Sequence, residues 1–218
     1  MHDAIRSDLV KIAKTMYDKQ MLNAYEGNVS IKVDDRIYIT PSSVCKGFLT
    51  EDMLVAVDAQ GNVVEAQGKY VPSSETKLHL ECYRLRPDIT SVVHNHSPFA
   101  TAFAIANMPI QTRAYSEMII AFDTIPVVPY GTPSTPEVYD GLSKYIHTVD
   151  TFMIGNHGIV AVGSDVYDAF FKIEAAESIA KSLTIARLLG GESPIPDHQI
   201  EVLYRIRKEK FGRDKLEL

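Results

Sequence analysis

The first stretch of the chain repeats apolar residues at helical spacing. Its apolar members are Ile5, Leu9, Ile12, Ala13 and Met16. This spacing places them on one face, so we expect an amphipathic helix from residue 3 to about 22. The same period returns late in the chain and predicts a long helix over residues 165–189, which two glycines end.

Between these helices, apolar residues alternate with polar ones at the period of a strand. The stretch EGNVSIKVDDRIYITPSS, residues 26–43, predicts a hairpin that turns at Asp34-Asp35. MLVAVDAQGNVVEA predicts a second hairpin over residues 53–66. Further strands are expected in ITSVVHNH (89–96), in IPVVPY (125–130) and twice in TFMIGNHGIVAVG (151–163).

Four more helices separate these strands. They are expected over 73–86, 98–106, 134–146 and 197–210. The third would be capped by Ser134 or Thr135, with Pro136 in its first turn. Hairpins interleaved with helices favour an α/β fold with a mixed, mainly antiparallel central sheet flanked by helices. We find no repeat or linker, so we expect residues 1–218 to form a single domain.

Composition and charge exclude several classes of function. The chain has 218 residues, a net charge of -6 and no block of basic residues, which disfavours nucleic acid as a partner. No apolar run reaches the roughly 20 residues of a membrane span, so we expect no membrane partner. Only two cysteines are present and they form no Cys-x-x-Cys pair. This usage, without a signal peptide, indicates a cytoplasmic protein.

Three histidines suggest a metal site. His94 and His96 end an apolar run, and alternate residues of a strand point the same way. His157 lies between glycines that let the backbone turn sharply and approach a ligand. Three imidazoles with an open position are typical of a catalytic divalent metal site. His79 also precedes them in the chain, and we expect it in a structural or surface role.

A proton carrier and an anion pocket complete the candidate site. Glu75 is the best candidate base, although an acidic residue in a first helical turn also simply complements the helix dipole. The helix start around it offers free amides and two hydroxyls that can hold a phosphate. Turn residues at the ends of the first hairpin can add donors to the same pocket. The candidate phosphate-binding residues are Gly27, Asn28, Ser42, Ser43, Ser73 and Ser74.

Six motifs in order resemble the class II aldolase/adducin family, and within it most closely the L-fuculose-1-phosphate aldolases. They are GNVS, ITPSS, VPSSE, VVHNHS, IPVVPY and GNHGIVAVG. The resemblance implies a three-layer fold with a mixed, mainly antiparallel sheet. It also implies a homotetramer whose active sites lie at subunit interfaces.

The resemblance further assigns roles to residues. It implies one divalent metal ion per subunit, most often zinc and otherwise manganese or cobalt, on His94, His96 and His157. Glu75 would be the acid/base and at times a further ligand, and Tyr115 would act in a neighbouring subunit's site. The implied reaction cleaves a phosphorylated sugar, a ketose 1-phosphate, to dihydroxyacetone phosphate and an aldehyde through a metal-stabilised enediolate.

Three departures bear on the substrate, and several other activities fit the same residues. Ser43 stands where these aldolases usually have glycine, Phe211 replaces a tyrosine of the C-terminal tail, and Glu117 lies near Tyr115 where small apolar residues are usual. The alternatives are a ribulose-5-phosphate 4-epimerase, a sugar-phosphate decarboxylase or dehydratase, and a non-catalytic adducin-like scaffold. The epimerases typically carry aspartate at the position of Glu75, and a scaffold can lose the metal ligands that this chain retains.

Overall fold

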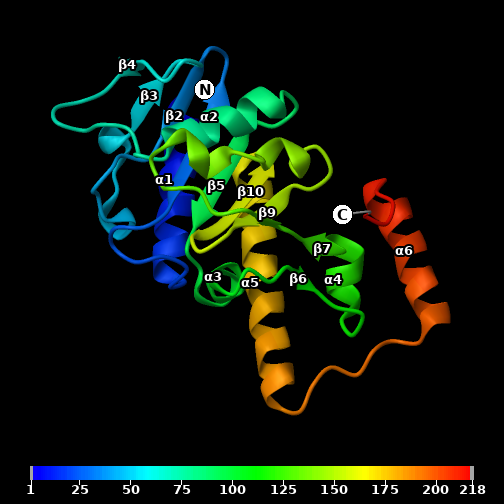
Figure 1. Ribbon diagram of the computed structural model, residues 1–218. Helices are drawn as coiled ribbons and strands as arrows, with labels where there is room; N and C mark the ends of the chain where they lie inside the picture. Colours follow the sequence, from blue (N-terminus) through cyan, green and yellow to red (C-terminus); the bar gives the residue numbers. More distant parts are fainter. Residues whose placement is uncertain (1, 217–218) are drawn as a thin grey trace.

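The computed structural model describes residues 2–216, and its centre is one sheet of eight strands (Figure 1). The strand order is β4-β3-β2-β1-β5-β10-β9-β8. The strands are β1 (Asn28–Val33), β2 (Arg36–Ile39), β3 (Val55–Val57), β4 (Val63–Glu65), β5 (Ser91–Asn95), β8 (Val127–Val128), β9 (Thr151–Ile154) and β10 (Gly158–Gly163). All neighbours pair antiparallel except β8 and β9. The predicted mixed, mainly antiparallel sheet is therefore confirmed.

Helices cover both faces of this sheet. The α-helices are α1 (His2–Asp18), α2 (Thr76–Leu85), α3 (Pro98–Ile105), α4 (Ser116–Ala121), α5 (Val166–Leu188) and α6 (Asp197–Phe211). One apolar cluster joins α1, α3 and α5 to the sheet through Val93, and a second joins α2 through Val92. Successive residues of β5 thus face opposite layers, which explains why this central strand is buried throughout.

The region after β8 differs from its prediction. Instead of one helix over residues 134–146, the chain forms two short 3-10 helices, η3 (Pro136–Tyr139) and η4 (Leu142–Lys144). Gly141 between them has φ +80°, a left-handed conformation that interrupts a right-handed helix. Neither Ser134 nor Thr135 caps with its side chain. The continuous-helix prediction is therefore wrong.

Smaller differences occur where helices are short or end. α1 stops at Asp18, four residues earlier than expected, and Gln20 then adopts φ +58°. Helix α4 and the strand β6 (Ile110–Gln111), which pairs with β7 (Thr124–Ile125), were not predicted. Six or fewer residues are too few to display a periodic pattern.

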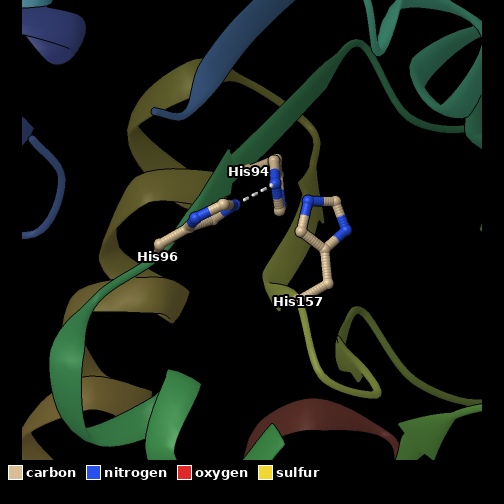
Figure 2. Close-up of side chains that lie close together, drawn as sticks. All are labelled: His94, His96 and His157. Carbon is tan, nitrogen blue, oxygen red and sulfur yellow. Dashed lines mark hydrogen bonds between the residues drawn. The ribbon is translucent and has the colours of Figure 1, made fainter. Parts of the chain in front are cut away.

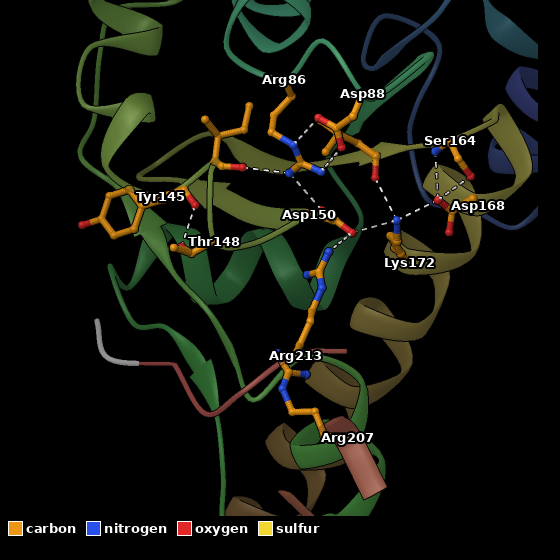
Figure 3. A network of polar contacts seen from close by, with 12 residues as sticks. Arg86, Asp88, Tyr145, Thr148, Asp150, Ser164, Asp168, Lys172, Arg207 and Arg213 are labelled. Carbon is orange, nitrogen blue, oxygen red and sulfur yellow. Dashed lines mark hydrogen bonds and ion pairs between the residues drawn. The ribbon is translucent and has the colours of Figure 1, made fainter. Parts of the chain in front are cut away.

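An ion pair between Arg213 and Asp150 links the C-terminal segment to the sheet. Asp150, just before β9, lies 3.1 Å from Arg86, 3.1 Å from Lys172 and 2.5 Å from Arg213 (Figure 3). Burial raises the pKa of Asp150, but Arg213 and Lys172 outweigh burial and lower the pKa to about 2. Helix α6 itself packs beside α4 (Figure 1), where Tyr204 donates a hydrogen bond to Asp123.

Two further points concern the whole chain. No helix among residues 2–216 is long and apolar enough to cross a membrane. The expectation of one domain over residues 1–218 remains a prediction, and residues 1, 217 and 218 lie outside the described part.

Candidate active site

Antiparallel pairing brings the three histidines together. His94 lies near the end of β5, opposite Val160 of β10. The turn that precedes β10 must therefore lie beside the end of β5, and this turn carries His157. A Cβ atom at Gly158 would be 2.7 Å from Cδ2 of His96 and 3.1 Å from Cε1 of His94. Glycine after His157 thus permits the close approach that its position in the sequence suggested.

The imidazole rings form a compact triangle (Figure 2). Their centroids are 5.0 Å apart for His94 and His96, and 4.9 Å apart for each of the other two pairs. One nitrogen from each ring lies within 4.8 Å of the others. Nε2 of His94 and Nε2 of His96 are only 3.1 Å apart. This is the kind of convergence that a three-histidine metal site requires.

Polar contacts at the outer nitrogens orient two of the rings. Nδ1 of His94 lies 2.9 Å from the carbonyl oxygen of Ile159, which can only accept, so this nitrogen carries the hydrogen. Burial lowers the pKa of His94 to about 3, and the neutral ring therefore directs the lone pair of Nε2 inward. Nδ1 of His96 lies 3.5 Å from a carboxylate oxygen of Glu26. Such outer partners are typical of histidines that bind metal.

Glu75 completes the cluster from the opposite direction. It immediately precedes α2, and its carboxylate oxygens lie 3.1 Å from Nε2 of His157 and 3.3 Å from Nε2 of His94. Burial raises the pKa of Glu75, but the two imidazoles and the amide of Asn28 outweigh burial and lower it below the usual range. The group is therefore ionised at neutral pH.

Unpaired polar atoms indicate that this cluster is built for a ligand. Oε1 of Glu75 and Nδ1 of His157 are buried without a hydrogen-bond partner among the described residues. Buried polar groups are normally paired, so an exception calls for an explanation. A divalent cation accepting electron pairs from His94, His96 and His157, with Glu75 alongside, fits these donors.

The loops predicted to hold a phosphate also meet at this place. A bridge between Pro41 and Pro72 sets the loop of Ser42 and Ser43 beside that of Ser73 and Ser74. Ser43 adopts φ +56°, a left-handed conformation that glycine adopts most readily. The family resemblance implies a glycine at this position, and the positive φ of Ser43 is a conformation that glycine would adopt without strain.

The remaining phosphate candidates lie at the start of β1. Gly27 has φ +72°, and a Cβ there would come within 3.0 Å of the carbonyl oxygen of His94. Asn28 pairs with His94 across the strands, and its Nδ2 donates a 2.8 Å hydrogen bond to Glu75. No structural feature tests whether these residues bind phosphate, and that role remains a prediction.

Other candidates lie elsewhere in the subunit. Tyr115 is the residue before α4, half-buried, and its hydroxyl makes no hydrogen bond with the described residues. Phe211 ends α6 and lines a cavity of about 380 Å³ with Asp150 and Arg213. That cavity lies at the other end of β9 from His157. Glu117 is exposed in the first turn of α4.

For His79, the expectation of a structural or surface role was only partly correct. It is completely buried and contacts Asn28 and Ser30, so the structural part of the expectation holds and the surface part does not. The spacing of four residues from Glu75, the residue before α2, was the signal for its position, because residues four apart along a helix lie on the same side.

Comparisons with known proteins agree with this geometry. Residues 7–184 match the family model of the class II aldolase and adducin N-terminal domain. An L-fuculose phosphate aldolase from Methanocaldococcus jannaschii is 35% identical over 184 residues, which cover 84% of this chain and 97% of the relative. A 3-oxo-tetronate 4-phosphate decarboxylase from Haemophilus influenzae is 30% identical over 187 residues, covering 83% of this chain and 88% of the relative.

A solved structure extends the likeness to the whole fold. An L-fuculose 1-phosphate aldolase superposes with a TM-score of 0.84 at 28% identity, covering 95% of this chain and 97% of that one. The resemblance suggested by the motifs is thereby confirmed. The chain belongs to the class II aldolase and adducin family, and its aldolase and decarboxylase relatives are lyase-type enzymes.

Proposed function

We propose that the protein is a metal-dependent aldolase that cleaves a ketose 1-phosphate of the L-fuculose-1-phosphate type to dihydroxyacetone phosphate and an aldehyde. The observation that carries this proposal is the convergence of His94, His96 and His157 on one point beside a buried carboxylate with an unpaired oxygen. The M. jannaschii relative, an L-fuculose phosphate aldolase, supports the choice of substrate class.

The three histidines would hold one divalent cation per subunit, namely zinc, with manganese or cobalt as substitutes. Such an ion supplies Lewis-acid polarisation of the ketose carbonyl and of the hydroxyl next to it. The outer contacts of His94 with Ile159 and of His96 with Glu26 keep the inner nitrogens free of hydrogen.

Glu75 would move the proton. Its carboxylate is ionised and buried next to the imidazoles, so it can take a proton from the substrate during aldol addition and return it to the same carbon after cleavage. Tyr115 of a neighbouring subunit would orient or protonate the aldehyde oxygen. This role requires the homotetramer that the family resemblance implies.

The phosphate of the substrate would lie in the pocket between the two serine loops. Its donors would be the amide of Gly27, the side chain of Asn28, and the hydroxyl and amide groups of Ser42, Ser43, Ser73 and Ser74. Amides and hydroxyls can bind an anion without a cluster of basic side chains, which suits a chain of net charge -6. The reduced cysteines Cys45 and Cys82 support a cytoplasmic location.

The experiment is an assay of phosphorylated ketoses that detects dihydroxyacetone phosphate, with and without a chelator. We expect release from at least one ketose 1-phosphate, loss of activity with chelator, and recovery when zinc is restored. Turnover that a chelator leaves unchanged would refute the metal-dependent proposal. Metal analysis of the purified protein adds an independent check, because a scaffold without a catalytic role has no need to bind zinc, manganese or cobalt.

A second function is favoured by one specific comparison. The H. influenzae relative is a 3-oxo-tetronate 4-phosphate decarboxylase, and decarboxylation also leaves negative charge beside a polarised carbonyl. Release of carbon dioxide from a 3-oxo acid phosphate, without dihydroxyacetone phosphate from any ketose, would identify this activity instead. Interconversion of pentulose 5-phosphates without any cleavage product would identify an epimerase.

A further inference from the structure

A buried chain of hydrogen bonds leads away from Glu75 into the core. Nδ2 of Asn28 lies 2.8 Å from Glu75, and Oδ1 of Asn28 lies 2.5 Å from Nε2 of His79. Nδ1 of His79 lies 2.6 Å from Oγ of Ser30, which lies 2.8 Å from the hydroxyl of Tyr83. Each of these side chains is at least nine-tenths buried. We call these five residues the Glu75 relay.

The secondary structure explains why the relay forms. Asn28 and Ser30 are alternate residues of β1 and therefore project from the same face of the sheet. His79 and Tyr83 are four residues apart on α2 and share the helix face that packs on this side of the sheet. The strand and the helix thus contribute alternate members of one continuous chain.

Only one arrangement of hydrogens satisfies the relay when His79 is neutral. The ionised carboxylate of Glu75 can only accept, so the NH2 group of Asn28 must face it. The oxygen of Asn28 then faces His79, and because it can only accept, Nε2 of His79 must carry the hydrogen. Nδ1 consequently accepts from Ser30, and Ser30 accepts from Tyr83.

The surroundings of His79 keep it neutral. Its ring is completely buried and contacts no carboxylate directly. Burial lowers the pKa of His79 to about 4, and Glu75 opposes this only in part. The ring therefore has one donor and one acceptor nitrogen, and Ser30 determines which is which.

We propose that His79 is a positioning residue, which holds the amide of Asn28 with its NH2 group toward Glu75 and so fixes the carboxylate beside the histidine cluster. Reversing this amide would set a carbonyl oxygen against the carboxylate and leave Nε2–H of His79 without an acceptor. One hydrogen of Nδ2 is used by Glu75, and the second has no partner among the described residues, so it is available to the substrate. The effect on turnover rests on the proposed function, whereas the hydrogen positions do not.

A purely structural role makes a different prediction. If the relay only stabilised the core, replacing His79 would lower the melting temperature and leave kcat of the folded enzyme unchanged. Tyr38 provides a matched control, because its hydroxyl is also buried and bonded, to His2, in a part of β2 outside the relay.

The kinetic test compares three variants as zinc-loaded enzymes at a temperature where all are folded. His79→Leu removes the donor, and we expect kcat to fall by about 10- to 100-fold, as for other residues that orient a site residue. His79→Gln retains an NH2 donor, and we expect it to restore most of kcat. Tyr38→Phe should lose stability but not kcat. An unchanged kcat in His79→Leu would overturn the proposal.

A spectroscopic test does not depend on activity or on the folding of a variant. In zinc-loaded protein labelled with nitrogen-15, we expect His79 to carry its hydrogen on Nε2 and the side-chain amide of Asn28 to exchange slowly. A hydrogen on Nδ1 of His79 would overturn the proposal even in an active enzyme. If the protein cleaves no sugar phosphate, the proposed function fails, while this measurement still decides the arrangement of the relay. Ser30→Ala, which removes the donor to Nδ1, should broaden or shift the His79 signal.

Discussion

Two polar clusters lie at opposite ends of β9, and they differ in whether their polar atoms have partners within the protein. Before the strand, Asp150 is paired with Arg86, Lys172 and Arg213 (Figure 3). After the strand, His157 joins two other histidines whose inner nitrogens face one another (Figure 2). The first cluster pairs charges of opposite sign, whereas the second leaves buried atoms without partners.

The comparison separates a cluster whose charges are paired within the fold from one whose converging nitrogens fit a metal ion. Opposite charges in contact stabilise each other without further groups. Converging lone pairs of His94 and His96, only 3.1 Å apart between Nε2 atoms, repel unless a cation or a proton lies between them. Substitutions around Asp150 should therefore lower mainly the stability, whereas substitutions in the histidine cluster should lower mainly the activity.

The largest effect is expected for His96→Ala. It removes one of three nitrogens from the proposed metal site, and losing a direct ligand should exceed the roughly 10- to 100-fold cost in affinity seen for outer contacts. We expect bound metal to be lost and turnover to fall to background, measured by elemental analysis and by the aldolase assay. His147→Ala, an exposed histidine outside the cluster, is the control. Full metal content in His96→Ala would contradict the site.

Glu75→Gln should separate metal binding from proton transfer. The amide retains the size and position of the carboxylate but cannot take up a proton. We expect metal to be retained while kcat falls by about 10²- to 10⁴-fold, the usual contribution of a general acid or base. Glu81→Gln on the outer side of α2 should leave kcat unaffected. A fully active Glu75→Gln enzyme would show that the acid/base role is wrong.

Asp150→Asn should lower the stability of the fold without changing metal binding. It leaves three cations without their shared carboxylate, and we expect a loss of about 1–3 kcal/mol in the free energy of unfolding, less than for a fully buried pair because the site is partly exposed. Urea unfolding monitored by circular dichroism measures this loss. Bound metal should stay the same, and a variant as stable as the wild type would contradict the structural role.

The shifted pKa of Asp150 also predicts how the free energy of unfolding depends on pH. The pKa of Asp150 is about 2 in the fold against 3.8 without its partners, so the unfolded chain binds the proton more readily. The stabilisation is present above about pH 4 and is lost as the pH falls toward 2. Between these values, the unfolding free energy of Asp150→Asn should change less with pH than that of the wild type.

The smallest effect is expected for Glu26→Gln. Its carboxylate lies 3.5 Å from Nδ1 of His96 and is partly exposed, so it supports that ring without contacting the metal position. We expect metal affinity to fall by about 10-fold, the lower end for outer contacts, with no change in stability without metal. Competition with a chromogenic chelator measures this affinity. An equal affinity in both proteins would show that solvent replaces this contact.

Local pattern was sufficient for much of the candidate site. Alternation along a strand placed His94 and His96 on one face, and the glycine after His157 indicated a close approach that the structure contains. The hairpin at Asp34-Asp35 was also correct. In each case the information lies within a few neighbouring residues, where stereochemistry permits few alternatives.

Local pattern failed where distant residues decide the outcome. The segment after Ser134 has helical composition, yet Gly141 and packing against the sheet divide it into two 3-10 turns. Nothing near Asp150 in the sequence indicates three cationic partners, because they come from three other parts of the chain. Their meeting depends on strand order and on the return of the C-terminal segment.

By itself, the sequence determined the fold class, the family, the three histidines and the acidic residue beside them, because periodicity and motif spacing are properties of neighbouring positions. Only the tertiary structure decided which way Asn28 faces, that His79 stands behind it, and which polar atoms remain unpaired. The physical reason is that hydrogen-bond direction and burial depend on the register between strands and on helix packing, which join residues far apart in the chain.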